Sequence, residues 1–235
     1  MTMREDDVSM VLPCYNEENT LEGTVTKAKN ELEKHSKDFE IIIVEDGCTD
    51  STPEIASNLT SELECMKHLH FEERLGKGKA VEKGFESAEK SKLFFMDTDL
   101  ATDLNHISKL IEELDENDLV IGSRYIDGSE AERGLIRDLL SKGYNSLARL
   151  SFGTGISDHQ CGFKGINRDA YNDIKDSINS DHWFWDTELL VQAEENNYST
   201  KEIPVEWEEK EGSEVSVKNS IVYFSKKILG EKIGQ

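Results

Sequence analysis

The first 125 residues alternate between short apolar runs and amphipathic segments of helical period, and this alternation limits the possible folds most. The apolar runs predict five strands, at residues 8–12, 39–44, 68–71, 93–96 and 119–122. The run at 39–44 is nearly continuous, which favours a parallel strand buried on both faces. Alternating strands and helices predict an α/β fold with a mainly parallel sheet flanked by helices and joined by right-handed crossovers.

The amphipathic segments predict helices between these strands, and the second half of the chain continues with further helices. We expect a glycine–lysine loop at 76–79. Pro204 lacks a backbone N–H, so the strand expected at 200–207 belongs at a sheet edge. The expected helices lie at about 20–34, after Pro53, and at 80–88, 104–114, 135–152, 169–178 and 188–196.

Two carboxylates directly follow the apolar run at 93–96. Asp97 and Asp99 are separated only by Thr98, and alternate side chains of an extended chain point the same way. Both can therefore face one spot at the carboxyl end of the strand, where open α/β sheets bind ligands. Two oxygen ligands with open positions suit Mg²⁺ or Mn²⁺ shared with a diphosphate. Asp-x-Asp is common in an acidic chain, so the preceding strand is what gives the pair weight.

Polar residues also follow other expected strands. Tyr15 and Glu17 follow the first, Asp46 ends the second, and Arg124 follows the fifth. Because the carboxyl ends of parallel strands meet at one edge of a sheet, we expect these side chains around one crevice.

The charge of the chain excludes one broad class of partner. The 49 Asp and Glu residues outnumber the 27 Lys and Arg residues, giving a formal net charge of −22. Such a field repels nucleic acid, so we expect no nucleic-acid partner. The acidic residues are spread along the chain, as in proteins of a high-salt cytoplasm, which is a hypothesis about habitat.

The cysteine spacing does not indicate a disulfide scaffold, and the N-terminal sequence does not indicate a signal peptide. The four cysteines have no CxxC spacing, which argues against a zinc site or a disulfide framework and favours reduced thiols in the cytoplasm. The first residues lack the apolar core of a signal peptide. No apolar run approaches the 18 or so residues of a membrane span.

The segment 217–233 predicts an amphipathic C-terminal helix. Its apolar residues recur at helical spacing, and its lysines outnumber Glu231, which is typical of a membrane-surface anchor. A terminal helix packed on the domain, with lysines at the rim, is the alternative. The lysines are Lys218, Lys226, Lys227 and Lys232.

The motifs together form a series, LPCYNEENTL, VEDGCTDST, GKGKA, MDTDLATD, GSRY, SDHQCGFK and FWDTELL. This series, over about residues 8–215, resembles the family 2 glycosyltransferases of GT-A (Rossmann-like) fold. RGLIRDLLSKG, HWFWDTELL and VEWEEKEGS are most similar to the dolichyl-phosphate β-glucosyltransferases. The related mannosyltransferases have Gln where this chain has Ala101. The family's last motif tends to end in Gly-Ser-Lys, whereas Glu214 follows Gly-Ser here.

The resemblance implies transfer of a hexose, with glucose favoured, from a nucleotide sugar to a polyprenyl (dolichyl) phosphate for protein or surface glycosylation. The implied reaction is inverting and uses Mg²⁺ or Mn²⁺ held by Asp97 and Asp99. The donor would be UDP-glucose, or GDP-mannose in the mannosyl alternative. The implied organisation is a nucleotide-sugar half at 1–125, an acceptor half at 126–216 and a helix at 217–235. We expect a cytoplasmic protein, peripheral on the cytoplasmic face of a membrane.

The resemblance also implies roles for individual residues. Pro13, Tyr15, Glu17 and Asp46 would line the nucleotide pocket with Asp97, and Lys77 and Lys79 would approach the diphosphate. A turn-forming role for Asp46 and a solvated position for Lys79, or for its neighbour Lys77, are the alternatives.

Three of the seven arginines, Arg124, Arg133 and Arg137, are expected near the acceptor phosphate, because guanidinium groups bind phosphate bidentately. Asp158 and Asp186 would complete the catalytic set. Ion pairing with surface carboxylates is the alternative for the arginines, and helix capping is the alternative for Asp186.

Two further hypotheses stay open. A sugar-1-phosphate nucleotidyltransferase also uses a nucleotide-binding α/β sheet, but no GxGTRLxP-like signature lies near the first strand. A non-catalytic nucleotide-sugar-binding protein is the other, and retention of both Asp97 and Asp99 argues against it.

Overall fold

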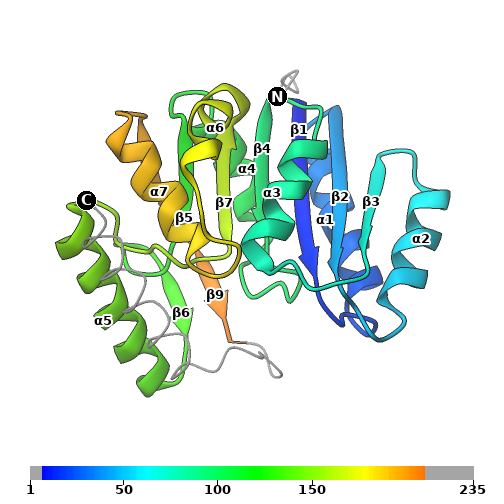
Figure 1. Cartoon of the computed structure of the whole chain (residues 1–235), viewed down its shortest axis with the longest axis horizontal. Helices are drawn as coiled ribbons and strands as arrows, with labels where there is room; N and C mark the ends of the chain where they lie inside the picture. The colour runs from blue at the N-terminus through cyan, green and yellow to red at the C-terminus, as the bar shows by residue number, and fades with distance from the viewer. Residues whose placement is uncertain (1–6, 210–235) are drawn as a thin grey trace.

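The computed structural model describes residues 7–209 and contains a seven-stranded sheet with helices on both faces (Figure 1). The strand order is β3-β2-β1-β4-β7-β5-β8. The strands are β1 (Asp7–Cys14), β2 (Asp38–Asp46), β3 (Met66–Phe71), β4 (Lys92–Met96), β5 (Leu119–Ser123), β7 (Phe163–Asn167) and β8 (Thr200–Pro204). All neighbours pair in parallel except β7, which is antiparallel to β4 and β5.

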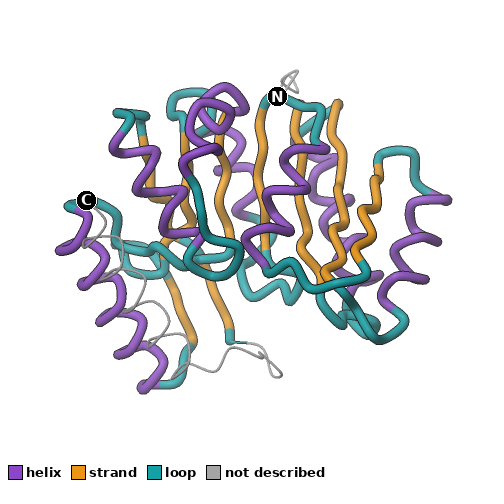
Figure 2. The backbone as a smooth tube through the Cα atoms, in the orientation of Figure 1, coloured by secondary structure: helices purple, strands orange, loops and turns teal. Residues whose placement is uncertain are grey.

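The helices form two layers, which Figure 2 shows on opposite sides of the strands. Side chains of α1 (Leu21–His35), α2 (Thr52–Glu62) and α4 (His106–Glu113) enter one core, and those of α3 (Lys77–Ser87), α6 (Arg168–Ile174) and α7 (Trp185–Glu195) enter the other. Along β1, Met10 and Leu12 face the first core and Val11 faces the second. This period-two alternation of wholly apolar residues makes a strand buried on both faces.

A second, two-stranded sheet lies beside the main one. It pairs β6 (Glu130–Glu132) with β9 (Glu206–Glu208), and the long helix α5 (Leu135–Phe152) follows β6 (Figure 1). Trp207 of β9 also forms an isolated bridge with Thr102, six residues after the end of β4. This small sheet therefore brings segments from both halves of the chain to the carboxyl ends of the main strands.

The α/β class, the mainly parallel sheet and the expected strands and helices of residues 7–196 are confirmed, with the edge position of β8. Three expectations were wrong. Residues 77–79 belong to α3, α7 begins at Trp185 rather than at 188, and 200–207 forms two strands. The strands β6 and β7 were not expected.

The C-terminal helix expected at 217–233 lies outside the described residues, and the division into halves at 125 stays a prediction. Within residues 7–209, no helix combines the length and the hydropathy that a bilayer span requires. All four cysteines are free thiols, as expected.

Candidate active site

Asp97 is held directly beyond the last residue of β4. Its backbone N–H donates to the carbonyl of Gly162 at 3.0 Å. A Cβ atom at Gly162 would lie 1.9 Å from Oδ2 of Asp97, so only glycine fits against this carboxylate. Gly162 therefore makes room for the Asp97 carboxylate.

Lys77, the first residue of α3, is the cationic partner of Asp97. Its Nζ lies 2.8 Å from Oδ1 of Asp97 and 3.8 Å from Oδ2 of Asp186. Asp186 is buried and pairs with Lys164 at 2.7 Å. Burial opposes the charge on Lys77, but Asp186 and Asp97 outweigh it and raise the pKa of this lysine. Two lysines and two aspartates thus form one charged network under the end of β4.

Lys77 and Lys164 balance the charges of Asp97 and Asp186, so the neighbouring Asp99 adds a further negative charge. Burial and the neighbouring Asp97 raise the pKa of Asp99 to about 6. Two mutually repelling carboxylates, one of them 36% exposed at its side chain, form a donor set that fits a hard divalent cation. Asp97 and Asp99 are therefore the residues that would hold Mg²⁺ or Mn²⁺.

The raised pKa of Asp99 predicts that Mn²⁺ binding depends on pH. Below pH 6 the metal-free carboxyl group holds a proton that the ion must displace, so apparent affinity should fall about tenfold per pH unit. Above pH 6 the affinity should level off. Calorimetric titration of Mn²⁺ between about pH 5 and pH 7 checks this, and Asp99→Asn should remove the dependence. A flat profile in the unaltered protein would contradict it.

The expected nucleotide pocket gathers at the ends of β1 and β2. Asp46 accepts hydrogen bonds from the backbone N–H groups of Leu75 and of Gly76, the latter at 3.1 Å. Arg74 Nε lies 3.2 Å from Oδ2 of Asp46, and the Arg74 guanidinium lies 3.3 Å from the centre of the Tyr15 ring. Asp46 thus does more than form a turn, because it fixes the 74–76 loop beside Tyr15.

Pro13 and Glu17 join this pocket to the carboxylate pair. The Thr98 hydroxyl, between the two aspartates, donates to the Pro13 carbonyl at 3.5 Å. Glu17 contributes to the raised pKa of Asp99, which places its charge near that carboxyl group. Lys79 lies apart, since its Nζ pairs with Glu82 at 2.5 Å along α3.

Two residues of this half have no sequence signal that sets them apart. Arg74 was not singled out, although it precedes the glycine–lysine motif by only two positions. The sequence favours Lys77 and Lys79 equally, and their ion pairs decide between them, because Lys77 reaches Asp97 whereas Lys79 pairs with Glu82.

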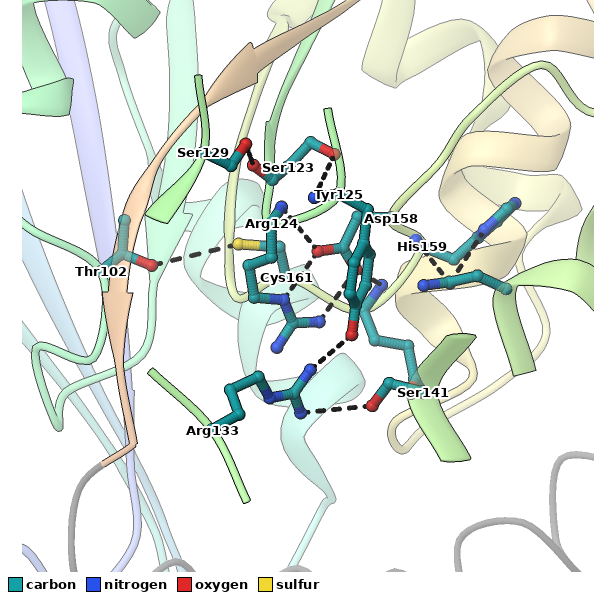
Figure 3. Close-up of polar contacts among 12 residues, drawn as sticks. Thr102, Ser123, Arg124, Tyr125, Ser129, Arg133, Ser141, Asp158, His159 and Cys161 are labelled. Carbon is teal, nitrogen blue, oxygen red and sulfur yellow. Dashed lines mark hydrogen bonds and ion pairs between the residues drawn. The ribbon is translucent and has the colours of Figure 1, made fainter. Parts of the chain in front are cut away.

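Arg124 and Asp158 form a buried ion pair on the other side of the site (Figure 3). Arg124 donates from Nε to Oδ2 at 2.7 Å and from Nη2 to Oδ1 at 2.8 Å, and its backbone N–H adds a third bond. Burial opposes ionisation of Asp158, but Arg124 outweighs it and lowers the pKa of the carboxyl group to about 2. Asp158 therefore positions Arg124.

Arg133 lies beside this pair but has different partners. Its Nη1 donates to the Tyr125 hydroxyl at 2.6 Å and its Nη2 to the Ser141 hydroxyl at 3.2 Å (Figure 3). The guanidinium groups of Arg124 and Arg133 lie 5.3 and 4.8 Å from the centre of the Trp207 ring. Within residues 7–209 Arg133 has no carboxylate partner, so its charge is available to an anion.

Arg137 does not share this arrangement. It pairs with Glu209 at the start of α5, as the ion-pairing alternative predicts. A pocket of about 470 Å³ opens beside Arg124 instead. Its lining has three cationic side chains, from Arg124, Lys142 and Arg149, and includes Tyr125 and Ser146.

The segment from Asp158 to Lys164 connects the two sides of the site. Asp158 holds Arg124, Gly162 lies against Asp97, and Lys164 donates to the Cys161 carbonyl while pairing with Asp186. Asp186 is buried in the first turn of α7 and does not cap it. This short segment thus contacts Asp97 and Asp186 on one side and Arg124 on the other, an arrangement suited to two phosphate-bearing molecules.

Comparison with known proteins agrees with this arrangement. The sequence model of Glycosyl transferase family 2 matches residues 9–175. The chain is 42% identical over 227 residues to Glycosyltransferase AglD of Haloferax volcanii, covering 95% of this chain and 36% of AglD. It is 31% identical over 243 residues to the dolichyl-phosphate beta-glucosyltransferase of Saccharomyces cerevisiae, covering 94% and 73%. The chain thus spans about a third of AglD and nearly three quarters of the yeast protein.

A solved structure shares the fold. Glucosyl-3-phosphoglycerate synthase from Mycobacterium tuberculosis, in complex with Mn²⁺, uridine diphosphate and phosphoglyceric acid, superposes with a TM-score of 0.70 at 17% identity. The match covers 96% of this chain and 79% of the synthase. Together with the motif series and the sheet, the matches establish that the chain belongs to glycosyl transferase family 2 and has the GT-A fold.

Proposed function

We propose that this chain transfers glucose from UDP-glucose to the phosphate of a polyprenyl lipid such as dolichyl phosphate. The observation that carries the proposal is Arg133, a partly buried guanidinium beside Arg124 whose hydrogen bonds within the described residues go only to hydroxyl groups. Arg133 lies over Trp207, which forms a bridge with Thr102, three residues beyond Asp99, and this location suits an anionic acceptor opposite a nucleotide diphosphate. The names of the yeast and human relatives, dolichyl-phosphate beta-glucosyltransferase, support glucose and dolichyl phosphate.

The donor half of the proposal uses the carboxylate pair. Tyr15, Glu17 and Asp46 would receive the nucleoside, and Asp97 and Asp99 would hold Mg²⁺ or Mn²⁺ against its diphosphate. When bound, this ion neutralises the negative charge that builds on the departing diphosphate. Lys77, now paired with Asp97, is near enough to contribute a second positive charge.

The acceptor half uses the guanidinium groups. A phosphate monoester with a second pKa near ~6 is largely ionised at neutral pH, so it needs positioning more than deprotonation. A phosphate oxygen forms a bond to the anomeric carbon while the bond from that carbon to the diphosphate breaks, and the nucleoside diphosphate leaves. This single displacement inverts the anomeric configuration.

Exposed apolar side chains on α5, the helix that follows Arg133, support a lipid acceptor. Leu135, Ile136, Leu139 and Leu150 of α5 are 71 to 89% exposed, and α5 starts two residues after Arg133. Such a surface would suit an isoprenoid chain at the membrane boundary. Binding to the cytoplasmic face of a membrane through 217–233 stays a prediction, because that segment lies outside the described residues.

A transfer assay tests the proposal. The protein is incubated with Mn²⁺, polyprenyl phosphate and either UDP-glucose or GDP-mannose, and the glycolipid is measured. Glucolipid from UDP-glucose supports the proposal, whereas mannolipid alone would support the mannosyl alternative. No glycolipid from either donor would contradict it.

Arg133→Gln is expected to weaken acceptor use about 10- to 150-fold in kcat/KM for the lipid, the equivalent of one charge-assisted hydrogen bond of about 1.5–3 kcal/mol. Binding of UDP with Mn²⁺ should be unchanged. Arg168→Gln is the matched control, because Arg168 donates to the Lys90 carbonyl at 2.7 Å and lies in α6. Equal effects of the two substitutions would contradict a phosphate-binding role.

A further inference from the structure

A second cluster of ligand-type side chains lies at the edge of the sheet, on strands β2 and β3 (Figure 1). His68 and His70 alternate along β3 and therefore point to the same face. Glu45 of β2 is the register partner of His70 and reaches the same place. One ligand atom from each of the three side chains lies within 4.8 Å of the other two.

Two buried polar atoms of this cluster have no hydrogen-bond partner. Glu45 is 0% exposed, and its Oε2 has no hydrogen-bond partner. His68 Nε2 is also buried without a hydrogen bond, although it lies 3.5 Å from Oε1 of Glu45. The second histidine, His70, contacts the same Glu45 oxygen through Nδ1. A wholly buried carboxylate oxygen without a donor is rare in folded proteins, so this one calls for a ligand.

His68 and Glu45 have the spacing of two ligands of one metal ion, while His70 hydrogen-bonds directly to the same Glu45 oxygen. Bonds of about 2.0–2.1 Å from an ion to imidazole and carboxylate ligands separate those ligand atoms by about 3–3.5 Å. The 3.5 Å between His68 and Glu45 falls in that range. The His70 side chain is 54% exposed, which leaves a path for an ion from solvent.

We propose that Glu45, His68 and His70 bind a divalent transition-metal ion of the Zn²⁺ type. Two imidazole nitrogens and one carboxylate favour Zn²⁺ over Mg²⁺ or Mn²⁺, which prefer all-oxygen sites such as Asp97 and Asp99. The ion bridges the edge strand β3 to β2. Glu45 and Asp46 are consecutive in β2, so the ion lies on the opposite face of the sheet from the Asp46 carboxylate. The site is thus separate from the glycosyl-transfer chemistry and has a structural role.

Thermal unfolding of metal-free protein, with and without added Zn²⁺, tests this inference. At a Zn²⁺ concentration about a hundred times the dissociation constant, the midpoint should rise by about 5–10 °C. His70→Gln and His68→Gln should each remove most of the rise. His35→Gln is the matched control, because His35 also contacts a glutamate, Glu31, at 3.0 Å, and it should keep the full rise.

Two further measurements separate this site from the others in the chain. The variant with Asp97→Asn and Asp99→Asn should keep the Zn²⁺-dependent rise, since it alters only the oxygen site. The Co²⁺-loaded protein should show d–d absorption without a thiolate charge-transfer band. No rise in the unaltered protein, a rise that survives His70→Gln and His68→Gln, or a thiolate band from a cysteine such as Cys48 would each overturn the proposal.

Discussion

Asp97→Asn should lower the rate of sugar transfer by about 10²- to 10³-fold at saturating donor and acceptor, the typical loss when one preorganised electrostatic contact to developing charge is removed. Asparagine keeps the shape that Gly162 accommodates but removes the charge that faces Lys77 at 2.8 Å and the neighbouring Asp99. The fold should survive, because Lys77 retains Asp186 as a partner.

The matched control for Asp97 is Asp103→Asn in the same segment. The exposed Asp103 side chain accepts a hydrogen bond from the backbone N–H of Asn105 at 2.8 Å, so its substitution should leave transfer within about twofold, as surface changes usually do. Near-normal transfer by the Asp97 variant at saturating Mn²⁺ would contradict the assignment of the metal site.

Asp158→Asn should destabilise the protein by about 3–5 kcal/mol, because it leaves the charge of buried Arg124 without its partner. The Arg124 and Asp158 side chains are 6% and 0% exposed, so solvent cannot replace the lost carboxylate. The melting temperature should fall by about 6–20 °C, as measured by thermal unfolding. Exposed Asp127→Asn, four residues from Ser123 at the end of β5, is the control and should change little.

The Arg124–Asp158 ion pair also predicts that the stability of the fold decreases at low pH. The pKa of Asp158 is lowered from 3.8 to about 2 in the folded protein, so its stabilising contribution is fully present above pH 3.8. That contribution is lost as pH falls toward 2, because the unfolded state then binds the proton first. A stability difference between the unaltered protein and Asp158→Asn that stays constant from pH 6 down to pH 2 would contradict the lowered pKa.

The central parallel strands β1, β2, β4 and β5 could be predicted because each contains a largely apolar run, but β7 could not. Its sequence, FKGIN, contains Lys164 and Gly165 and has no alternating pattern. It forms a strand only because β4 and β5 supply hydrogen bonds on both sides. Gly165 is needed there, since a Cβ atom would lie 2.8 Å from a methyl group of Leu110. Such a strand depends on long-range partners that no local pattern contains.

The start of α3 was missed for a similar reason. Gly76 and Gly78 argue locally for a loop, yet Gly78 lies within α3. Glycine is required at this helical position, because a Cβ atom there would lie 2.2 Å from Cβ of Trp185. This tight packing of α3 against α7 is what brings Lys77 to Asp97 and Asp186. The carboxylate pair could be predicted from its spacing, whereas its lysine partner follows from tertiary contacts.

The arginine cluster was predicted in part. Arg124 and Arg133 meet at Trp207, but Arg137 turns to Glu209. The position of Asp158 in the DHQC motif marked it as important without indicating its partner. Only the pairing of Arg124 with Asp158 shows that this carboxylate acts through an arginine rather than on a substrate.

The most direct test is the anomalous diffraction of Mn²⁺ in crystals soaked with MnCl₂ and UDP. The account predicts one strong peak bound by Asp97 and Asp99, with the UDP diphosphate on the same ion and the base near Tyr15 and Asp46. A peak at Glu45, His68 and His70 alone, or UDP bound without any ion near Asp97, would contradict it.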